Sequence, residues 1–594
     1  MFWKICFFIA LAIVLLALVV MIVRMIRKKD VDIFKWLVAS AFLSTFVMFL
    51  PLYSDLFFDS RFGILRTVLL SFHNTIRLFV VDADYMFIIE NIKGMANEFA
   101  PFYTAYMAIL FIVCPIFTFG FILSFFKNVS ARLKLFFHYF SEIYVFSELN
   151  DSSITLAKDL KKNNPRRVIV FCDVFENNEE ASYELMGEVK QVGAICFKRD
   201  ILNVNFKLHS AKKGLYFFAI GEDNEENINQ SLNLIATYGE IENTNLYLFS
   251  NSVESELLLS TVKNKKIKVR RINVIQSLIN KDLYYNGVQL FSNARETDDP
   301  SKKEISAIVV GMGQYGVEMV KTLVWYCQMD GYSIRINAFD QDPQAKDKFV
   351  LDCPEIMSDD YNGVYVDGEA QYRVDIHSGM VVGTNSFAEK IKEINDATYV
   401  FVALGSDEEN IKMAVMLRTQ FERMGIKPII QAVVYNSKLA KHLTDIKNYR
   451  GQSYGIDLIG DFESIYSESV IIDSELEADA LKRHLKWGKE EDFWQYEYNY
   501  RSSTASAIHM RARIACGIPG AGKAEDELTE EEIAVIEPLE HKRWNAYMRS
   551  QGYLFSGSKD KSSRNDLGKM HHDLVDFESL SEEDKRKDRS VGSK

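Results

Sequence analysis

The stretch "ISAIVVGMGQYGVEMVKTLV", Ile305 to Val324, decides the fold of the soluble part of this chain. It predicts a buried β-branched strand, then a G-x-G-x-x-G turn made by Gly311, Gly313 and Gly316, then an amphipathic helix. Such glycines permit a tight turn and a close backbone approach to a phosphate, which the helix N-terminus attracts. The stretch therefore predicts a parallel α/β sheet with a nucleotide site at the end of this strand.

A second strand, within "IRINAFDQDP", ends at Asp340. An acidic residue at this place can accept hydrogen bonds from ribose hydroxyl groups. The spacing from the glycines to Asp340 is longer than the usual value of about 20 residues, so we expect an enlarged connection. The expected cofactor is NAD(H) or another adenine nucleotide. The alternative is an α/β shell that is kept for its architecture and binds no nucleotide.

An internal repeat indicates that this fold occurs twice. The segment "YFFAIGEDNEENINQSLNLIATY" (Tyr216–Tyr238) matches "YVFVALGSDEENIKMAVMLRTQF" (Tyr399–Phe421). Each copy is typical of a buried strand, a Gly-acidic turn, an asparagine and an amphipathic helix. We therefore expect two doubly wound, Rossmann-like domains, residues 142–300 and residues 301–487.

The first copy lacks the glycines. Aligned on its strand, Ser147, Leu149 and Ser152 take the three glycine positions. Leu149 places a side chain where a phosphate would need close approach, so we expect this copy to be degenerate and structural. Asp173, after the next strand, is interpreted as the relic of a residue like Asp340.

The N-terminal residues 1–135 are predicted to form a transmembrane domain. Ile5–Val23, Trp36–Tyr53 and Phe102–Phe126 are uncharged, and each is long enough to cross about 30 Å of hydrocarbon as a helix. Basic residues flank these runs at Arg24, Arg27, Lys28, Lys29, Lys35, Lys127, Arg132 and Lys134. Positive residues favour the cytoplasmic side, which predicts a multi-pass protein of the cell membrane with its large C-terminal region in the cytoplasm.

Residues 62–81 predict a further, amphipathic helix. Arg66, His73 and Arg77 fall on one of its faces, with apolar residues around the rest. Such a helix can lie in the membrane interface, or it can be re-entrant and line an aqueous path with its polar face. A full fourth span would place one basic cluster outside. The first 130 residues hold no G-x-G, so a conventional potassium filter is absent.

Composition excludes several classes of protein. The chain has 594 residues and a net charge of -12 without a basic tail, which argues against nucleic-acid binding. Its seven cysteines show no ligand spacing, so we expect reduced thiols and no metal site. No catalytic constellation is visible, and His377 is interpreted as a packing or surface histidine. We therefore predict that the chain is not an enzyme.

The C-terminal residues 491–594 predict a small, mainly α-helical module. "GIPGAGKA" (Gly517–Ala524) nearly matches a phosphate-binding loop, but Ala524 lacks the hydroxyl group and a helix is expected where a strand should precede. We interpret it as a connection. The next helix, in "LTEEEIAVIEPLEHKRWNAYMRSQGY", begins with a capping-box pattern at Thr529 and Glu532.

This module resembles the RyR domain, the repeat found in ryanodine receptors and in small bacterial proteins. The matching residues are Glu540, His541, Trp544, Gly552, Tyr553, Lys569, His571, Leu574, Val575, Leu580, Glu583, Lys585, Asp588 and Arg589. His572 and Asp576 stand where prolines are usual, and Phe577 replaces a tyrosine. The resemblance implies a ligand site at His541, Trp544, Tyr553 and Lys569, where aromatic rings and cations could bind a purine nucleotide. The alternative is that Trp544 and Tyr553 are simply the core of a small domain.

The segment from Glu142 to Trp487 resembles the RCK domains, also called TrkA-N or KTN domains. This resemblance implies a nucleotide- or ion-sensing pair that assembles as a homodimer or homotetramer and moves a membrane segment. Together the features predict a ligand-gated membrane protein, an ion channel or membrane effector that senses a nucleotide or nucleotide-derived messenger, with antiphage signalling as one setting. The alternatives are a regulatory subunit of a potassium transporter and a membrane-anchored NAD(P)-dependent enzyme.

Overall fold

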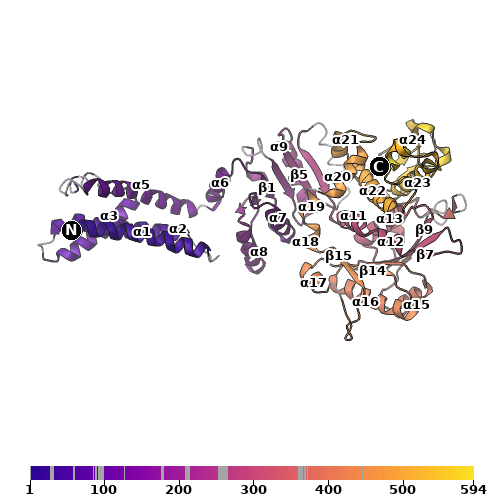
Figure 1. Cartoon of the computed structure of the whole chain (residues 1–594), viewed down its shortest axis with the longest axis horizontal. Helices are drawn as coiled ribbons and strands as arrows, with labels where there is room; N and C mark the ends of the chain where they lie inside the picture. Colours follow the sequence, from indigo (N-terminus) through magenta and orange to yellow (C-terminus); the bar gives the residue numbers. More distant parts are fainter. Residues whose placement is uncertain are drawn as a thin grey trace. The chain divides into compact units, whose positions relative to one another are not determined.

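The computed structural model describes residues 2–593, apart from 27–32, 58–60, 84, 85, 87, 89, 91, 93–98, 126, 175–178, 208–213, 252–264, 359–364, 367, 368, 371, 444, 445 and 473. The chain forms two compact units, Met1–Phe137 and His138–Lys594. Figure 1 shows the helices and strands of both units, coloured along the sequence. Apolar helices make up the first unit, and parallel sheets covered by helices make up most of the second.

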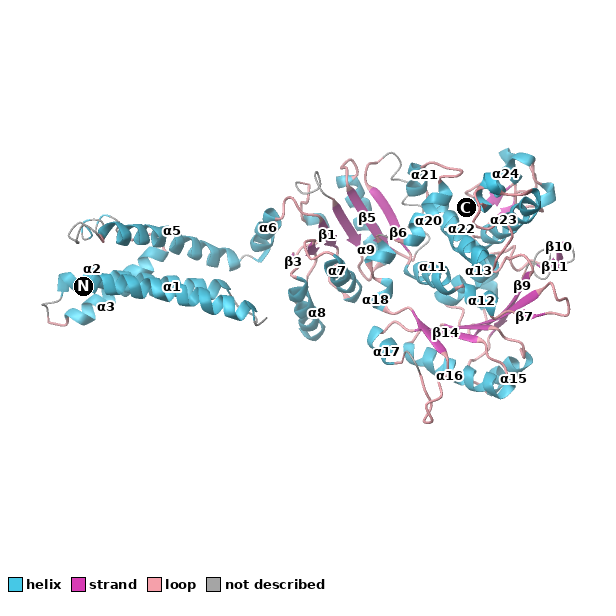
Figure 2. Ribbon diagram, in the orientation of Figure 1, coloured by secondary structure: helices cyan, strands magenta, loops and turns pink. Residues whose placement is uncertain are grey.

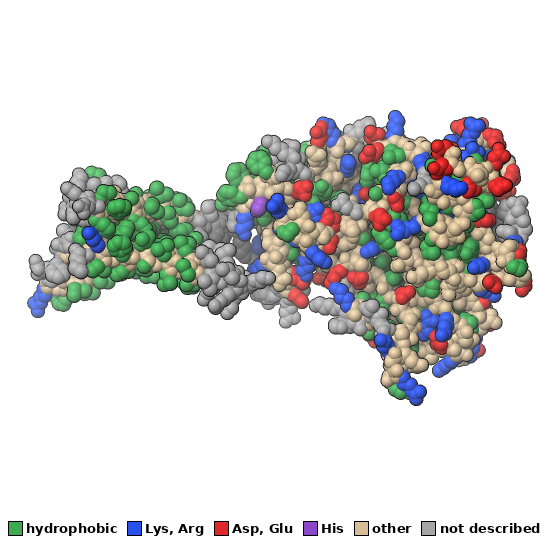
Figure 3. Space-filling view, viewed as in Figure 1, with side chains coloured by type: hydrophobic (Ala, Val, Ile, Leu, Met, Phe, Trp, Pro, Cys, Tyr) green, Lys and Arg blue, Asp and Glu red, His purple; other side chains and the backbone are tan. Residues whose placement is uncertain are grey.

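The first unit is a helical bundle. Its helices are α1 (Phe2–Ile26), α2 (Ile33–Phe57), α3 (Gly63–Phe79), α5 (Ala100–Phe125) and α6 (Lys127–Phe137). Three of them contain windows long and apolar enough to cross a membrane: Phe2–Val20, Trp36–Ser54 and Ala100–Phe119. Hydrophobic side chains cover the visible face of this unit (Figure 3). The three predicted apolar helices are therefore present. Part of the first basic connection, residues 27–32, lies outside the described residues, and the orientation stays a prediction.

Helix α3 packs with its small polar side chains inward. Thr67, Ser71, Asn74 and Thr75 are buried, and the helix contacts α2 and α5. Its outer face is apolar, with Ile64 86% exposed. A helix on the surface of a soluble protein shows the reverse pattern, because its apolar stripe faces the core. The packing of α3 therefore suits a hydrocarbon surrounding.

The first sheet of the second unit has six parallel strands in the order β3-β2-β1-β4-β5-β6. They are β1 (Ile143–Phe146), β2 (Val168–Phe171), β3 (Ile195–Cys196), β4 (Leu215–Ala219), β5 (Thr244–Phe249) and β6 (Lys268–Ile272). The helical segments that connect and follow them are α7 (Asp151–Asn163), α8 (Glu179–Val192), η1 (Ile201–Asn203), α9 (Asn224–Tyr238), α11 (Val274–Asn286) and α12 (Val288–Ser292). The central strands are fully buried because helices cover both faces, which explains their continuous apolar runs.

The second sheet repeats this order as β12-β9-β8-β13-β14-β15. Its strands are β8 (Lys303–Val310), β9 (Tyr332–Asp340), β12 (Arg373–Ser378), β13 (Tyr399–Val402), β14 (Ile429–Val433) and β15 (Ile456–Ile459), with β7 (Arg295–Glu296) antiparallel to β8. The helices are α13 (Gln314–Tyr326), α14 (Ala345–Asp352), α15 (Asn385–Glu393), α16 (Asp407–Met424) and α17 (Ser437–His442); β10 (Tyr365–Val366) and β11 (Glu369–Ala370) form a small ladder. The strands of both sheets are visible in Figure 2. The predicted repeat thus corresponds to two sheets of one strand order.

The chain then returns to the first sheet. After β15 come α18 (Phe462–Ile465), α19 (Glu468–Ile471) and α20 (Glu475–His484), and α18 and α19 pack against α7. The carboxylate of Glu468 accepts hydrogen bonds from Arg167 at 2.7 Å and from Asn163 at 2.8 Å. These contacts join the two halves of the repeat.

The C-terminal segment packs on the second sheet. It consists of α21 (Glu490–Gln495), α22 (Glu497–Ala515), η3 (Glu525–Glu527), α23 (Glu530–Ser550), β16 (Leu554–Phe555), η4 (Lys561–Ser563), β17 (Met570–His571), η5 (Phe577–Ser579) and α24 (Glu582–Gly592). Helix α23 contacts α13, and Nε2 of the buried His509 lies 2.7 Å from the carbonyl oxygen of Gln328. One hydrophobic core contains side chains of both parts. The mainly helical character expected for residues 491–594 is present.

Candidate functional site

A crevice opens where β8 and β13 lie side by side at the centre of the second sheet. The chain leaves these two strands toward neighbours on opposite sides, and ligands of open α/β sheets bind at such a point. The crevice has a volume of about 550 Å³. Its walls are Gly311, Gly313, Gln314, Tyr315, Asp340, Gln341, Val382, Gly383, Ala403, Leu404, Gly405, Glu409, Asn410, Lys412, Met413, Met416 and Tyr435.

A different structural reason explains the glycine at each of the three positions. Gly311 has φ +96°, and a Cβ there would lie 2.2 Å from the carbonyl oxygen of Ala403. A Cβ on Gly316 would lie 1.7 Å from the carbonyl oxygen of Gly311, so this position permits close packing of helix and strand. Gly313 differs, because a Cβ there would meet no described atom within 4 Å. It is the glycine that leaves space for a ligand.

The N-terminus of α13 faces this space. Gly313 is the N-cap residue and provides no side chain to accept from the first N–H groups of the helix. These groups need an acceptor, and together with the helix dipole they favour an anion. A phosphate at this place fits the geometry.

Asp340 lies in the wall of the crevice, but its carboxylate already has partners. One oxygen accepts a hydrogen bond from the N–H of Met312 at 2.6 Å, and the other accepts from the N–H of Asp342 at 2.7 Å. Each carboxylate oxygen has a second lone pair that can accept from a ribose hydroxyl group. The residue therefore fixes the glycine turn as well as facing the predicted ribose position.

A repeated asparagine holds the other side of the crevice. Asn410 accepts from the N–H of Leu404 at 2.5 Å and donates to the carbonyl oxygen of Val433 at 2.8 Å. In the first half, Asn227 accepts from the N–H of Gly221 at 2.7 Å and donates to the carbonyl oxygen of Phe249 at 3.0 Å. The asparagine seen in both copies of the sequence repeat thus ties the end of the fourth strand to the fifth.

Two aromatic side chains lie in the wall of the crevice, Tyr315 from the first turn of α13 and Tyr435 from the segment after β14. The rings of Tyr315 and Tyr435 meet edge to face with 5.7 Å between their centroids. Burial raises the pKa of both hydroxyl groups, so both stay protonated at neutral pH. Met413 and Met416 add apolar surface, and Lys412 adds a cation. This combination suits a ligand with a flat ring and a phosphate.

The corresponding place in the first half is closed. Asn150 caps α7, accepting from the N–H of Ser153 at 2.9 Å, and its amide donates to the carbonyl oxygen of Ile220 at 2.7 Å. Ser147 Oγ accepts from the N–H of Ile220. Protein groups therefore occupy the positions that a phosphate would use. This arrangement agrees with the structural role expected for the first copy.

Two other sequence features contribute no wall to the crevice. His377 stacks on Phe339 with 4.6 Å between ring centroids, and its Nε2 lies 3.1 Å from Oδ1 of Asn337. Burial lowers its pKa, so the ring is neutral. The Gly517–Ala524 segment follows helix α22 rather than a strand, and Lys523 pairs with Glu532 at 2.5 Å. His377 thus packs on a neighbouring ring, and the Gly517–Ala524 segment links α22 to the following helical segment.

A second cavity, of about 500 Å³, lies in the C-terminal segment between α20, α22, α23, β17 and α24. His541 and Trp544, two of the residues assigned by resemblance, line it. His541 Nε2 lies 2.8 Å from the carbonyl oxygen of Val575, and Nδ1 lies 3.1 Å from the carboxylate of Asp588. The two partners fix the orientation of the imidazole ring in the wall.

Tyr553 and Lys569 do not belong to the described walls of this cavity. The Tyr553 side chain is buried in the core shared with the second sheet, and its hydroxyl donates to Asp566 at 3.4 Å. Lys569 has a left-handed backbone, and its ammonium donates to the carbonyl oxygen of Gln551 at 2.9 Å. For Tyr553 the packing alternative describes what the structure shows.

The same wall holds a group that could accept a metal ion: His571, His572 and Asp573. His571 Nδ1 accepts from the N–H of Asp573 at 3.1 Å, so the neutral ring carries its proton on Nε2. Burial and the Arg564 guanidinium lower the pKa of His571 to about 3. A metal could bind this ring only after that hydrogen bond breaks. The Nε2–H group therefore suits an anionic hydrogen-bond acceptor better than a cation.

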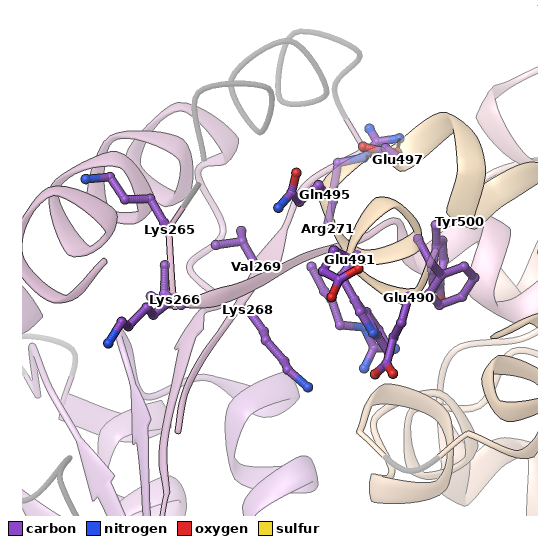
Figure 4. Close-up of a pocket in the computed structure, with 14 residues that line it drawn as sticks. Lys265, Lys266, Lys268, Val269, Arg271, Glu490, Glu491, Gln495, Glu497 and Tyr500 are labelled. Carbon is purple, nitrogen blue, oxygen red and sulfur yellow. Dashed lines mark hydrogen bonds and ion pairs between the residues drawn. The ribbon is translucent and has the colours of Figure 1, made fainter. Parts of the chain in front are cut away.

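A third hollow, of about 370 Å³, separates the edge strand β6 from α21 and the start of α22. Figure 4 shows Lys268 pointing from β6 into this hollow, with Glu490, Glu491 and Tyr500 on the facing side. The guanidinium of Arg270 lies 5.4 Å from the ring centroid of Trp494 and also pairs with Glu477. Basic and acidic side chains both line the hollow, so it favours neither an anionic nor a cationic ligand.

The basic residues of α3 lie beside its buried polar face. Arg66 and His73 are exposed on the single chain, and Arg77 pairs with Asp82 at 3.0 Å. A charged side chain is costly in hydrocarbon. The residues predicted to line a path are therefore available to water, a lipid headgroup or a second subunit.

Known proteins do not identify the chain: no protein-family model matches it, and no significant match is found among curated proteins.

Proposed function

We propose that this chain is a ligand-gated membrane protein, an ion channel or membrane effector whose soluble part senses a nucleotide or a nucleotide-derived messenger. The soluble part would consist of two Rossmann-like halves that resemble RCK domains and a C-terminal module that resembles an RyR domain. Three apolar helices and two parallel sheets of the order 3-2-1-4-5-6 support this proposal. That strand order is the one in which dinucleotides bind at the central crevice.

The space beside Gly313 is the observation that carries the proposal. It lies at a helix N-terminus without a side-chain cap, in a crevice that Asp340, Tyr315 and Tyr435 also line. A phosphate would accept from the first N–H groups of α13, a ribose would contact Asp340, and a base would lie on the tyrosine side. The expected ligand is NAD(H) or another adenine nucleotide.

The contacts between the two halves supply a route for the response. Ligand binding can shift a protein between two states only through different affinities for them. Glu468, which follows the second sheet, bonds to Arg167 and Asn163 beside the first sheet. A movement at the crevice that changes β15 and α18 would therefore reach α7 and the first sheet, which follows the membrane helices in the chain.

Binding is the first test. The Gly313→Ala substitution adds a methyl group only to the ligand space, and φ of -67° suits alanine. We expect the full chain in detergent to bind NADH or ADP at the crevice, and Gly313→Ala to weaken the binding at this site at least about tenfold, or 1.4 kcal/mol. Gly187→Ala, at an exposed position of α8 with open space, is the matched control. Equal affinity of Gly313→Ala and the native chain would contradict the crevice assignment.

Conductance is the second test. Purified full-length protein in liposomes should conduct ions when the nucleotide that binds in the first test is added, and less so with Gly313→Ala. Tight binding without conductance would favour the second candidate, a regulatory subunit of a transporter. That candidate has its own support, because residues 1–130 contain no G-x-G for a potassium filter.

A further inference from the structure

Three arginine side chains are buried at one end of the C-terminal cavity. Arg513 and Arg543 are each 1% exposed, and Arg483 is 6% exposed. Arg513 Nη2 donates to Glu540 at 2.5 Å, and Arg543 Nη2 donates to the other oxygen of the same carboxylate at 2.7 Å. Arg483, Arg543 and Glu540 line the cavity.

The charges of this cluster do not balance. Glu540 is the carboxylate that Arg513 and Arg543 share, while Arg483 donates to the backbone carbonyl oxygens of Val591 and Ser593. Asp588, another acid in the wall of the cavity, pairs with His541. Three guanidinium groups therefore face one shared carboxylate, and buried excess charge is costly unless a counter-ion compensates it.

The pKa values of a basic and of an acidic group in the cluster both reflect the excess of positive charge. Burial, together with the neighbouring Arg513 and Arg543, lowers the pKa of Arg483 to about 10 despite the attraction of Glu540. Burial alone would raise the pKa of Glu540, yet Arg543 and Arg513 hold it at about 2. An anion in the cavity would relieve the repulsion between the guanidinium groups.

Unpartnered donors point to the same conclusion. Arg513 Nη1 and Arg543 Nη1 are buried and have no hydrogen-bond partner among the described residues. A buried donor that is left unsatisfied costs about 1–3 kcal/mol, and more when it is charged. Such donors are expected at a site whose ligand supplies acceptor oxygens.

The outer wall adds cations and flat rings. Lys561, Arg564 and Lys587 line the cavity and are partly exposed; Lys561 and Lys587 share Asp584 of the wall, and Arg564 pairs with Asp566. Trp544 lies in the wall with its ring 4.9 Å from that of His571, and Trp487 is 43% exposed at the same cavity. A volume of about 500 Å³ fits a ligand of nucleotide size.

We propose that this cavity is a second ligand site, separate from the crevice, that takes a nucleotide with its phosphates toward Arg543 and Arg483 and its base against the tryptophan side. The site deepens the proposed function by naming where a messenger would bind, and it rests on that function only for the effect on the membrane helices. Arg483 donates hydrogen bonds to the carbonyl oxygens of Val591 and Ser593 at the end of α24. Phosphate binding would compete for this guanidinium and loosen the end of α24.

The test uses the full chain in detergent with Gly313→Ala, which silences the crevice. Calorimetric titrations with ADP, adenosine and pyrophosphate separate the two parts of the ligand. We expect ADP to bind at least about tenfold more tightly than either part alone, because base and phosphate contacts add. Pyrophosphate binding as tight as ADP would overturn the base contact, and no binding of any probe would overturn the site.

Substitutions at exposed wall positions avoid the buried cluster. Arg564→Ala should weaken ADP binding about tenfold, as expected for one charge-assisted contact to phosphate. Lys559→Ala, at an exposed position outside the cavity, should leave the affinity unchanged. If Gly313→Ala alone abolishes all ADP binding, the second site fails while the proposed function stands. If Arg564→Ala removes binding and Gly313→Ala does not, the crevice fails while the second site stands.

Discussion

The Nε of Arg271 donates to the carboxylate of Glu497 at 2.7 Å, which bonds the edge strand of the first sheet to the first turn of α22. Both side chains are almost fully buried, at 3% and 10% exposed. Helix α22 also supplies Ser502, Ser503 and Ser506 to the wall of the C-terminal cavity. One ion pair therefore joins the first sheet to a helix that borders the second proposed ligand site.

Breaking this pair should destabilise the soluble part. Removing the charge of Glu497 leaves a buried guanidinium with a weaker partner, which costs about 3 kcal/mol. We expect Glu497→Gln to lower the midpoint of thermal unfolding of the detergent-solubilised chain. Glu491→Gln, an exposed position on α21, is the matched control. A midpoint unchanged in Glu497→Gln would show that the pair contributes nothing.

Two glycines of the same turn should respond differently to alanine. A Cβ on Gly316 would lie 1.7 Å from a backbone oxygen, so helix and strand must separate. We expect Gly316→Ala to lose more than about 3 kcal/mol of stability or to aggregate, since overpacking against backbone is not relieved by a rotamer change. Gly313→Ala should unfold like the native chain. The check is denaturant unfolding of both variants followed by circular dichroism.

The repeated asparagines should matter about equally in the two halves. Asn410→Ala leaves the N–H of Leu404 and the carbonyl oxygen of Val433 without partners, which costs about 3 kcal/mol. Asn227→Ala should cost a similar amount. Asn233→Ala, at an exposed position of α9, should be neutral. Only Asn410→Ala should also weaken nucleotide binding, because only this residue borders the open crevice.

The soluble part should lose stability when the pH falls below about 6.5. Burial lowers the pKa of His571 to about 3 and that of His509 well below its usual range. The unfolded chain therefore binds more protons than the folded chain below pH 6.5, and stability falls by about 1.4 kcal/mol per pH unit for each such histidine. Asp573 and Asp588, whose pKa burial raises, act in the opposite direction at lower pH.

Unfolding midpoints at pH 7.5, 6.5 and 5.5 check this slope. His571→Asn should flatten the curve because it removes one of the protons taken up on unfolding. A curve that rises toward pH 5.5 would show that the raised carboxyl groups dominate.

The basic residues of α3 should affect conductance if the helix borders the ion path. Replacing Arg66 and Arg77 by glutamine removes both charges and keeps polar side chains at one exposed and one partly exposed position. We expect the double variant to change ion selectivity in liposomes, because rings of charged side chains select ions by sign. Unchanged conductance and selectivity would remove α3 from the path.

Local sequence rules predict much of the fold. A Cβ on Gly316 would meet the backbone of Gly311 in the same turn, and Asn410 accepts from the nearby N–H of Leu404, so these roles follow from local sequence. The contact of Gly311 with Ala403 and the bond of Asn410 to Val433 depend on neighbouring strands. The periodicity of α3 also places Arg66, His73 and Arg77 correctly on one face. It does not tell which face packs inward, because that depends on whether the surrounding is water or lipid.

The buried arginines of the second proposed ligand site could not be found from the sequence, although His541 and Trp544 of the same cavity were predicted. Arg483 and Arg543 are 60 residues apart on two helices, and as charged helix residues they look like solvent-exposed positions. Their importance comes from burial, which only tertiary packing creates. Tyr553 and Lys569, in contrast, lie near Trp544 in the sequence, but their side chains point to a core and to a carbonyl oxygen.

The capped helix of the first half also determines how many nucleotides the two halves of the repeat can bind. The Asn150 side chain caps the N-terminus of α7, whereas Gly313 provides no side-chain cap for α13. The two halves therefore share a fold, but only the second half offers its helix N-terminus to a ligand. Of the two equivalent positions in the repeat, only the crevice should therefore bind a nucleotide, and binding at this position should saturate at one equivalent per polypeptide.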